Sequence, residues 1–443
     1  MSIDALNNPV ITGIGAVTPV GNDRESSWAA LLAGRSGIGP ISLFDSDELP
    51  IKIAAEVKDF DAEAIMGTKR WRRSARFTHF AVAAAREAVA DAGLAVAAQE
   101  VDGPPENIGG AGTALRVGRG GPLTVAADRD RVGVIVNSTV PGAVETEAMT
   151  DAFHAKGLRG VSSYYVPSMI PNMPACEVAI DLSVHGPVTA SALACASGNA
   201  ALLEARRMIL SGDADVVLCG GTDAGIGQIL FAGLVNMGAL SINDRPAAEA
   251  SRPFSLDRDG FVFGEGAVVF VMESAAHAAA RGARNYGSVL GGALTADAFH
   301  ISHPDPSGEQ PTRAVALALK NAGISADEVD LVSAHGTATK INDELETRAL
   351  RTVLGGHADQ VLVTAPKSMT GHMIGAAGAA GAMVALLAMR DGEVPPTANL
   401  HIPDPVCDLD YVPLVARKAT VKTALVDAFG FGGQNCVLVL RSS

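Results

Sequence analysis

Apolar strand-like segments alternate with helical segments along the chain, and this alternation limits the fold more than any other feature of the 443 residues. The strand-like segments form two series: 9–21, 132–139, 188–194 and 215–225, then 267–274, 329–339, 360–372 and 424–440. Strands that alternate with helices predict a largely parallel or mixed sheet that is covered on both faces. The sequence therefore predicts an α/β protein, and the similar order of the two series indicates an internal duplication.

Helical segments indicate what covers the sheet. One face of the segment 80–93 is apolar and carries Phe80, Ala84, Ala88 and Ala92. The longest apolar run, 374–389, is shorter than the roughly 20 residues that a membrane-spanning helix needs, and it consists mostly of alanine and glycine. We expect it to be a buried helix, with no membrane partner. The segment 98–130 is rich in glycine and proline, and we expect a long loop that is mobile or covers another part.

Composition excludes several classes of function. The chain has 48 acidic and 34 basic residues, a net charge of −14, which argues against non-specific binding of nucleic acid. Its five cysteines include no CxxC pair, so neither a zinc site nor a disulfide framework is expected. The sequence begins without a basic stretch followed by an apolar one, so no secretion signal is expected. These features predict a cytoplasmic enzyme with reduced thiols.

Cys195 lies between the strand-like segment 188–194 and the helical segment 199–210. At such a strand-to-helix turn, free backbone N–H groups and the positive end of the helix dipole favour a thiolate and lower the pKa of the thiol. The same N–H groups can bind an oxyanion. The alternative is an inert buried cysteine, which is the commoner case, and local sequence alone favours it.

Two histidines and a glycine-rich segment provide further candidate groups. His335 and His372 each follow a strand-like segment, where α/β folds gather reactive side chains, and Lys367 lies five residues before His372. Together they could stabilise a negative charge on oxygen. In the sequence FGFGG at 429–433, glycines permit close backbone approach to a ligand, although an ordinary tight turn explains it equally well. Thiolase, cysteine hydrolase and acyl-transfer chemistry all remain possible at this stage.

Five motifs in fixed order resemble those of the β-ketoacyl-acyl carrier protein synthases: ACASG around Cys195, SRPFSLDRDGFVFGEGA at 251–267, SAHGTAT with His335, PKSMTGH with His372, and FGFGG. The chain is similar to the elongating Cys-His-His members. This resemblance implies a thiolase-like fold, in which two duplicated βαβαβ-type halves, here 1–273 and 274–443, form five αβαβα layers. It also implies a homodimer.

The resemblance further implies a role for each candidate residue. Cys195 would carry the acyl chain as a thioester, and His335 and His372 would assist decarboxylation of malonyl-acyl carrier protein. The backbone N–H groups of Cys195 and Phe431 would bind the oxyanion, with Phe429 and Phe431 forming a gate. Lys367 would position groups near His372 and pair with Glu346, and Thr337 and Thr339 would bind pantetheine. Acyl carrier protein would be the partner, and no metal or redox cofactor is expected, since the substrates are carried on phosphopantetheine.

A basic cluster at 67–77 is a candidate docking site for the acidic carrier protein. Related enzymes bind their carrier through basic residues in this region, and Lys69, Arg70, Arg72 and Arg73 are the candidates here. A solvated surface without a partner is the alternative explanation.

Three departures from the family pattern leave the pathway open. Lys340 and Ile341 stand where many relatives have proline, Gln434 stands where many have threonine, and 98–130 is longer than usual. We expect fatty acid elongation. The alternatives are the ketosynthase subunit of a type II polyketide synthase, in a heterodimer with a chain-length factor, and a non-catalytic subunit that resembles such a factor. The sequence does not reveal the length or branching of the acyl chain.

Overall fold

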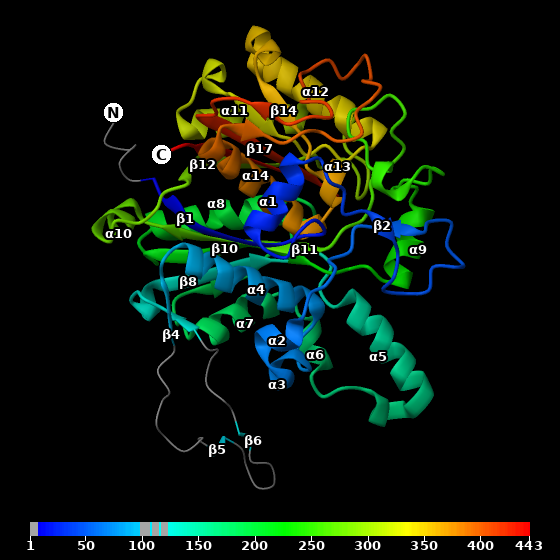
Figure 1. The fold of residues 1–443 in the computed structure, drawn as a ribbon, viewed down its shortest axis with the longest axis vertical. Coiled ribbons are helices and arrows are strands. Elements are labelled where there is room, and N and C mark those ends of the chain that lie inside the picture. Colours follow the sequence, from blue (N-terminus) through cyan, green and yellow to red (C-terminus); the bar gives the residue numbers. More distant parts are fainter. Residues whose placement is uncertain (1–7, 98–106, 109–114, 117–122) are drawn as a thin grey trace.

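The computed structural model describes residues 8–97, 107–108, 115–116 and 123–443 (Figure 1). Ten of the strands within this part of the chain form one sheet. These strands are β1 (Val10–Val17), β8 (Val132–Asn137), β9 (Val188–Thr189), β10 (Val216–Asp223), β11 (Gly266–Glu273), β12 (Gly287–Ala296), β13 (Leu331–Ser333), β14 (Leu362–Thr364), β17 (Thr423–Gly430) and β18 (Gln434–Arg441).

Four short strand pairs lie outside this sheet: β2 (Gly39–Pro40) with β3 (Ile53–Ala54), β4 (Ala95–Ala97) with β7 (Leu123–Val125), β5 (Asn107–Ile108) with β6 (Leu115–Arg116), and β15 (Glu393–Val394) with β16 (Arg417–Lys418). The α-helices are α1 (Arg24–Leu32), α2 (Ala62–Met66), α3 (Thr68–Trp71), α4 (Arg76–Asp91), α5 (Ala143–Lys156), α6 (Tyr165–Met169), α7 (Met173–Leu182), α8 (Ser197–Leu210), α9 (Gln228–Asn236), α10 (Ala275–Ala280), α11 (Glu309–Ala322), α12 (Lys340–Leu354), α13 (Lys367–Thr370) and α14 (Ala377–Asp391).

The strand order of the main sheet repeats itself. Outward from its centre, one half runs β1-β11-β10-β8-β9 and the other runs β12-β18-β17-β13-β14. In both halves the first two pairings are antiparallel and the last two are parallel. The halves meet where β1 pairs with β12. The predicted duplication is therefore confirmed, while the division at 273 and 274 stays a prediction.

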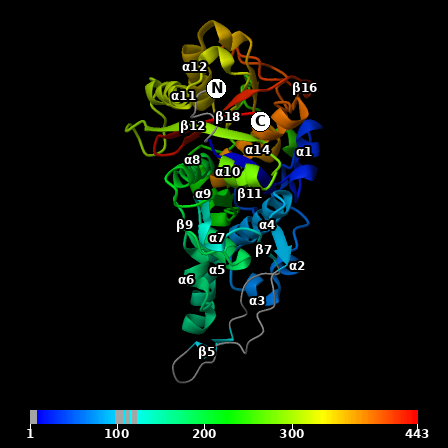
Figure 2. The same ribbon diagram turned by 90° about the vertical axis from the view of Figure 1, so that its left-hand side faces the viewer.

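Helices occupy equivalent places in the two halves and complete the layers. Helices α4 and α7 cover the outer face of the N-terminal half, and α11 and α12 cover the outer face of the C-terminal half (Figures 1 and 2). Helices α8 and α14 lie between the two halves of the sheet, and their apolar residues form one core cluster with both. The predicted α/β fold with five αβαβα layers is thus confirmed.

The central helices show why the apolar runs are buried. Residues Ile374–Asp391 are the one stretch of the described helices that is long and apolar enough to cross a membrane, yet 83% of it is buried inside the protein. The predicted buried helix is therefore confirmed. The apolar face of α4 is likewise buried, as Phe80, Ala84 and Ala88 predicted.

The strand predicted at 188–194 is wrong beyond its first two residues. Only β9 pairs with the sheet, and the chain then becomes irregular up to Cys195. Two side chains replace the ladder hydrogen bonds, since the Ser191 N–H donates to Asn137 Oδ1 at 2.8 Å and Thr139 Oγ1 donates to the Ala194 carbonyl at 2.8 Å. The segment 424–440 is a hairpin of β17 and β18 rather than one strand. Most of the loop predicted at 98–130 lies outside the described residues.

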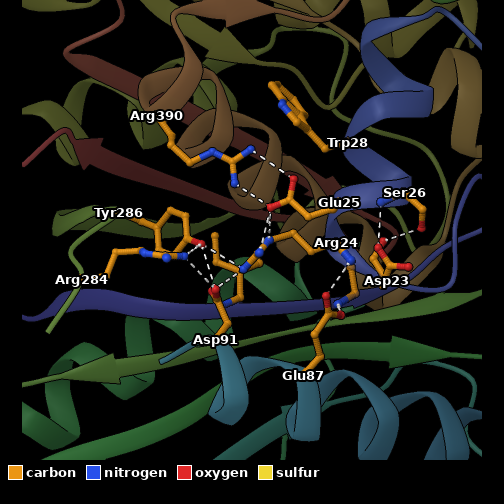
Figure 3. A network of polar contacts seen from close by, with 12 residues as sticks. Asp23, Arg24, Glu25, Ser26, Trp28, Glu87, Asp91, Arg284, Tyr286 and Arg390 are labelled. Carbon is orange, nitrogen blue, oxygen red and sulfur yellow. Dashed lines mark hydrogen bonds and ion pairs between the residues drawn. The ribbon is translucent and has the colours of Figure 1, made fainter. Parts of the chain in front are cut away.

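A polar network ties helix α1 to both halves (Figure 3). Arg24 on α1 pairs with Asp91 on α4 and donates to the Tyr286 hydroxyl at 2.9 Å. Glu87 on α4 accepts from the backbone N–H of Arg24 at 2.8 Å, and burial raises the pKa of this carboxyl to about 7. Arg390 on α14 pairs at 2.8 Å with the carboxylate of the residue that follows Arg24 in α1. The network thus holds α1 across the junction of the halves.

Candidate active site

Cys195 directly precedes Ala196, the N-cap residue of α8, and is 5% exposed. The predicted position at a helix N-terminus is therefore confirmed. Ala194 has a φ of +46°, a left-handed conformation that costs energy for a residue with a Cβ atom. Thr139 Oγ1 holds the Ala194 carbonyl, so contacts outside the turn maintain this conformation. The strained turn directs the thiol into the cavity described below.

His372 contacts the thiol directly. Its Nε2 lies 3.0 Å from Sγ of Cys195, and its Nδ1 accepts the backbone N–H of Ile374 at 3.2 Å. Because Nδ1 acts as an acceptor, the proton of the neutral imidazole lies on Nε2. His372 therefore donates toward the sulfur, as the sequence predicted for a histidine that stabilises negative charge.

The backbone of His335 is held from both sides. Its N–H donates to Glu346 Oε1 at 2.6 Å, and the Gly336 N–H donates to Oε2 of the same carboxylate at 2.8 Å. Lys367 Nζ donates to the His335 carbonyl at 2.5 Å. The ammonium group thus holds the backbone of His335, whose ring lies 5.5 Å from that of His372, which agrees with the prediction that Lys367 positions groups near His372. Glu346 and Lys367 both bond the backbone of His335, so they act on the same residue.

The thiol and the two imidazoles converge at one place. One donor atom from each of Cys195, His335 and His372 lies within 4.8 Å of the others, and the two imidazole rings are 5.5 Å apart between centroids. Burial, and next the charge of Lys367, lower the pKa of both histidines well below the usual value. Both are therefore neutral hydrogen-bond donors at neutral pH. Thiolate and imidazole also suit zinc, and the expected absence of a metal stays a prediction.

The expectation of a lowered thiol pKa is wrong. Burial raises the pKa of Cys195 to about 11, although the charge of Lys367 and the Phe431 N–H oppose the shift. The turn supplies favourable dipoles, but the buried site excludes the water that would solvate a thiolate. Cys195 therefore rests as a thiol and must lose its proton during reaction.

Two backbone N–H groups point at the position of the sulfur, those of Phe431 and of Cys195 itself. Gly430 allows this approach, since a Cβ atom there would lie 3.0 Å from the Cys195 nitrogen. Paired N–H groups beside a nucleophile form an oxyanion hole. The geometry agrees with the role predicted for these two N–H groups.

The segment 429–433 comprises the last two residues of β17 and the tight hairpin turn at 431–433 that leads to β18. Gly432 and Gly433 have φ values of +79° and +70°, which explains the glycines. The Gly432 N–H donates to the Ile301 carbonyl at 2.9 Å, and the Asp297 N–H donates to the Gly433 carbonyl at 2.9 Å. The Phe431 side chain is 39% exposed and lies at the cavity, while the Phe429 ring is 5.8 Å from that of His335. Both side chains line the cavity, and the gate that they were expected to form stays a prediction.

A cavity of about 590 Å³ opens from these residues. Its inner wall is apolar and includes Val140, Leu230, Leu234, Phe261, Phe263 and Ile374. Thr337 and Thr339 line another part, with their hydroxyl oxygens 3.0 Å apart. Lys340 and Ile341, two of the departures from the family pattern, also line it and are exposed. One part of the cavity is therefore apolar, and the part lined by the two threonines is polar.

Asp223 is a residue of this site that sequence reasoning missed. It is buried at the end of β10 and accepts from Ser138 Oγ at 2.6 Å and from the backbone N–H of Gly375 at 2.7 Å. Its carboxylate thereby joins the loop after β8 to the segment that follows His372. The position of an acid at the end of an apolar strand was the available signal.

The other four cysteines are not part of the site. Cys219 and Cys436 lie in β10 and β18, Cys176 lies in α7, and Cys407 lies in a loop. None of them lines the cavity within the described part of the chain. The thiolase alternative needs a second reactive cysteine beside the glycine turn, and Cys436 is buried in the core instead.

The residues of the basic cluster around α3 differ in their exposure and in their ion pairs. Arg70 pairs with Asp181, and with Glu177 at 2.9 Å, so it is committed to internal ion pairs, and its proposed docking role is not supported. Lys69, Arg72 and Arg73 are exposed. Arg73 stacks over the Tyr164 ring at 4.8 Å. These three residues, called the α3 cluster below, remain the predicted docking site.

Family models match nearly the whole chain. The model described as "Beta-ketoacyl synthase, N-terminal domain" matches residues 7–278, and "Beta-ketoacyl synthase, C-terminal domain" matches residues 286–401. A Synechocystis protein named 3-oxoacyl-acyl-carrier-protein synthase 2 is 40% identical over 98% of this chain and 97% of its own length. The protein of that name from Coxiella burnetii is 39% identical over 97% of both chains.

Solved structures resemble the fold over its full extent. One titled "The ishigamide ketosynthase/chain length factor" has a TM-score of 0.85 and 33% identity, covering 99% of both chains. A β-ketoacyl synthase from Burkholderia phymatum has a TM-score of 0.85 and 30% identity, covering 99% of this chain and 100% of that one.

The raised thiol pKa predicts how alkylation of Cys195 depends on pH. Because the thiolate is the reactive form, its rate of reaction with iodoacetamide should keep rising from neutral pH toward the pKa of about 11. Lys367→Met should slow the reaction, since it removes a charge that lowers this pKa. Labelling is measured at each pH by mass spectrometry, with Cys195→Ser as the control. A plateau near neutral pH would show instead that Cys195 rests as a thiolate.

Proposed function

Because this chain belongs to the β-ketoacyl synthase family, we propose that it joins an acyl chain held on Cys195 to malonyl-acyl carrier protein by decarboxylative Claisen condensation. The product is β-ketoacyl-acyl carrier protein, and the pathway is fatty acid elongation. The observation that carries this proposal is the convergence of a thiol with two neutral imidazoles within 4.8 Å. A non-catalytic subunit would not need this arrangement.

In the first step the sulfur of Cys195 attacks the thioester carbonyl of acyl-acyl carrier protein. The carbonyl oxygen becomes an oxyanion between the N–H groups of Cys195 and Phe431. The carrier thiol then leaves with the proton that Cys195 loses. Acyl-cysteine and free carrier thiol are the products, so the step needs no oxidant or metal.

In the second step malonyl-acyl carrier protein loses CO₂. The electrons of the broken carbon–carbon bond move onto the thioester oxygen, and His335 and His372 donate hydrogen bonds to the resulting enolate. Its carbon attacks the acyl-cysteine carbonyl, and the Cys195 thiolate leaves and takes up one proton from solvent, which balances the charge that the malonyl carboxylate brought in. Neutral donors suit this task, because the enolate requires stabilisation rather than a strong base.

The polar part of the cavity suits the phosphopantetheine arm, and the proposed reaction needs no other cofactor. Thr337 and Thr339 present hydroxyl groups that can bond its amides, while the apolar wall would hold the acyl chain. Lys340, which stands where many relatives have proline, also lines the cavity.

A type II polyketide ketosynthase is a second candidate. Two observations favour it: the 33% identity to the ishigamide ketosynthase/chain length factor, and a 29% identical structure titled as a type II PKS acyl-carrier protein in complex with its ketosynthase bound to the hexaketide. The 40% identity to a 3-oxoacyl-acyl-carrier-protein synthase 2 supports fatty acid elongation more strongly.

Variants of the site test the two half-reactions. Cys195→Ala should abolish condensation in a folded protein, and His372→Ala should reduce malonyl decarboxylation more than acyl transfer. Intact-protein mass spectrometry with a series of acyl-carrier proteins measures loading, and CO₂ release measures decarboxylation. Saturated chains retained on Cys195 support fatty acid elongation, and retention of polyketide chains alone supports the second candidate. Condensation by Cys195→Ala at the normal rate would refute both.

We also propose that two copies of the chain associate through β9 and the arm formed by α5 and α6. β9 is an exposed edge strand, α5 has no buried residue, and Phe153 and Leu158 are 52% and 85% exposed. Exposed apolar groups and an open strand edge each fit a symmetric partner. A chain-length factor is the alternative partner if the pathway is polyketide synthesis.

The combined substitution Phe153→Glu and Leu158→Glu should convert the dimer into monomer, because it places charges in an apolar interface. Light scattering after size exclusion measures the mass. Val415→Glu, at a 73% exposed site in the C-terminal half, is the control and should remain dimeric. If the arm variant keeps the mass of a dimer, association uses another surface.

The α3 cluster is proposed to dock the carrier protein. The chain is strongly acidic, so an acidic carrier needs such a local basic surface. In Figure 1, α3 lies on the outer side of the N-terminal half, whereas the hairpin at the cavity belongs to the C-terminal half. Cys195 also lines the cavity and belongs to the N-terminal half, so both halves contribute to the cavity that a carrier-bound chain must reach.

Charge reversal tests this docking. Arg72→Glu with Arg73→Glu should raise the KM for carrier-bound substrates by about tenfold or more at low salt, with kcat little changed. Lys320→Glu with Lys422→Glu makes the same change in net charge on the C-terminal half and is the matched control. Equal effects of the two pairs would show a general charge effect, and no effect of the first would remove the docking site.

A further inference from the structure

Asp427 lies on β17, directly behind the site, and is 2% exposed. Leu425 and Phe429 share its side of the strand, because side chains alternate along a strand. Both of these neighbours pack in the apolar core cluster of the C-terminal half. Neither carboxyl oxygen of Asp427 has a hydrogen-bond donor within the described part of the chain. A buried carboxylate without donors is costly, so this side chain needs an explanation.

The polar side chain beside Asp427 is Glu346, itself a carboxyl group. Both oxygens of Glu346 already accept backbone N–H groups, from His335 and Gly336. If both carboxyl groups were ionised, this contact would place two hydrogen-bond acceptors against each other. Two ionised carboxylates repel each other when buried, whereas a single proton between them makes a hydrogen bond.

We propose that Asp427 is a positioning residue that holds a proton and donates it in a hydrogen bond to Glu346, fixing the carboxylate that grips the His335 backbone. This inference deepens the proposed function, and its catalytic readout rests on that function. His335 must hold its ring beside Cys195, so a displaced Glu346 would move a donor to the enolate.

The proton lies on Asp427 because the two carboxyl groups have different partners. Two N–H groups favour the ionised form of Glu346, and no donor favours ionised Asp427. Burial, and next the charge of Glu346, raise the pKa of Asp427 well above the usual value.

The charges that face Asp427 agree with this assignment. They come from Glu346 on α12 and Lys367 on α13, while β18 contributes the Cys436 thiol. With Asp427 protonated, one carboxylate balances one ammonium group. With Asp427 ionised, two buried carboxylates would share that single cation.

Two substitutions separate donation from packing. Asp427→Asn keeps a donor in place of the acid O–H, so malonyl decarboxylation should stay within about threefold of wild type. Asp427→Leu keeps the branched arrangement of side-chain heavy atoms and has no donor, so decarboxylation should fall by about tenfold or more, because a hydrogen bond to a charged group is lost. Acyl transfer to Cys195 should stay within about threefold in both, which also shows that both variants fold.

Infrared spectroscopy tests the proton without any assay. At mildly alkaline pH, above the pKa of about 7 that burial gives Glu87, the wild type should show a protonated-carboxyl band that Asp427→Asn lacks. Glu87→Gln is the matched control, since it removes another buried carboxyl far from the site, and it should keep the band and both half-reactions.

The outcomes are distinct. A band that survives Asp427→Asn overturns the assignment of the proton, and equal decarboxylation by Asp427→Leu and wild type overturns the positioning role. Equal loss in Asp427→Asn and Asp427→Leu also overturns it, because donation would then be irrelevant. If wild type decarboxylates no malonyl-carrier protein but the band behaves as expected, the proposed function fails and the shared proton stands.

Discussion

The backbones of α8 and α14 touch, and the geometry of the site depends on this contact. A Cβ atom at Gly198 would lie 2.4 Å from the Ala379 nitrogen, and one at Gly378 would lie 2.9 Å from the Asn199 nitrogen. Only glycine permits such an approach. The two helices occupy equivalent places in the duplicated halves, so their N-termini meet at the junction. Cys195 stands before one helix and His372 before the other, which places thiol and imidazole 3.0 Å apart.

Burial determines the protonation states that the chemistry uses. It keeps both imidazoles neutral, so that they act as donors, and the same burial keeps Cys195 protonated at rest. Lys367 is the cation that opposes the second effect, yet it also lowers the histidine pKa values. One buried ammonium group thus favours the ionised thiol and the neutral imidazoles together. Burial lowers the pKa of Lys367 itself to about 8, and the charge of Glu346 opposes this shift.

Sequence reasoning found the groups that touch the reacting atoms, because Cys195, His335 and His372 lie in motifs with fixed spacing. It also found the layers, because burial on both faces of a sheet leaves apolar runs. It failed where side chains from distant segments decide the outcome. The strand before Cys195 gives way to hydrogen bonds from Asn137 and Thr139, and Arg70 turns inward toward Asp181. Asp427 gave no signal, since only the fold brings it to Glu346.

The hairpin at 429–433 joins two tasks in one short turn. Its Phe431 side chain lines the cavity, and the Phe431 N–H points at the sulfur. Rotation of the ring about its side-chain torsions changes the width of the cavity and leaves the N–H in place, whereas a shift of the turn's backbone moves both. Hydrogen bonds from Gly432 to the Ile301 carbonyl and from Asp297 to the Gly433 carbonyl hold that backbone. A chain that enters by ring rotation alone therefore meets two oxyanion donors that are already in position.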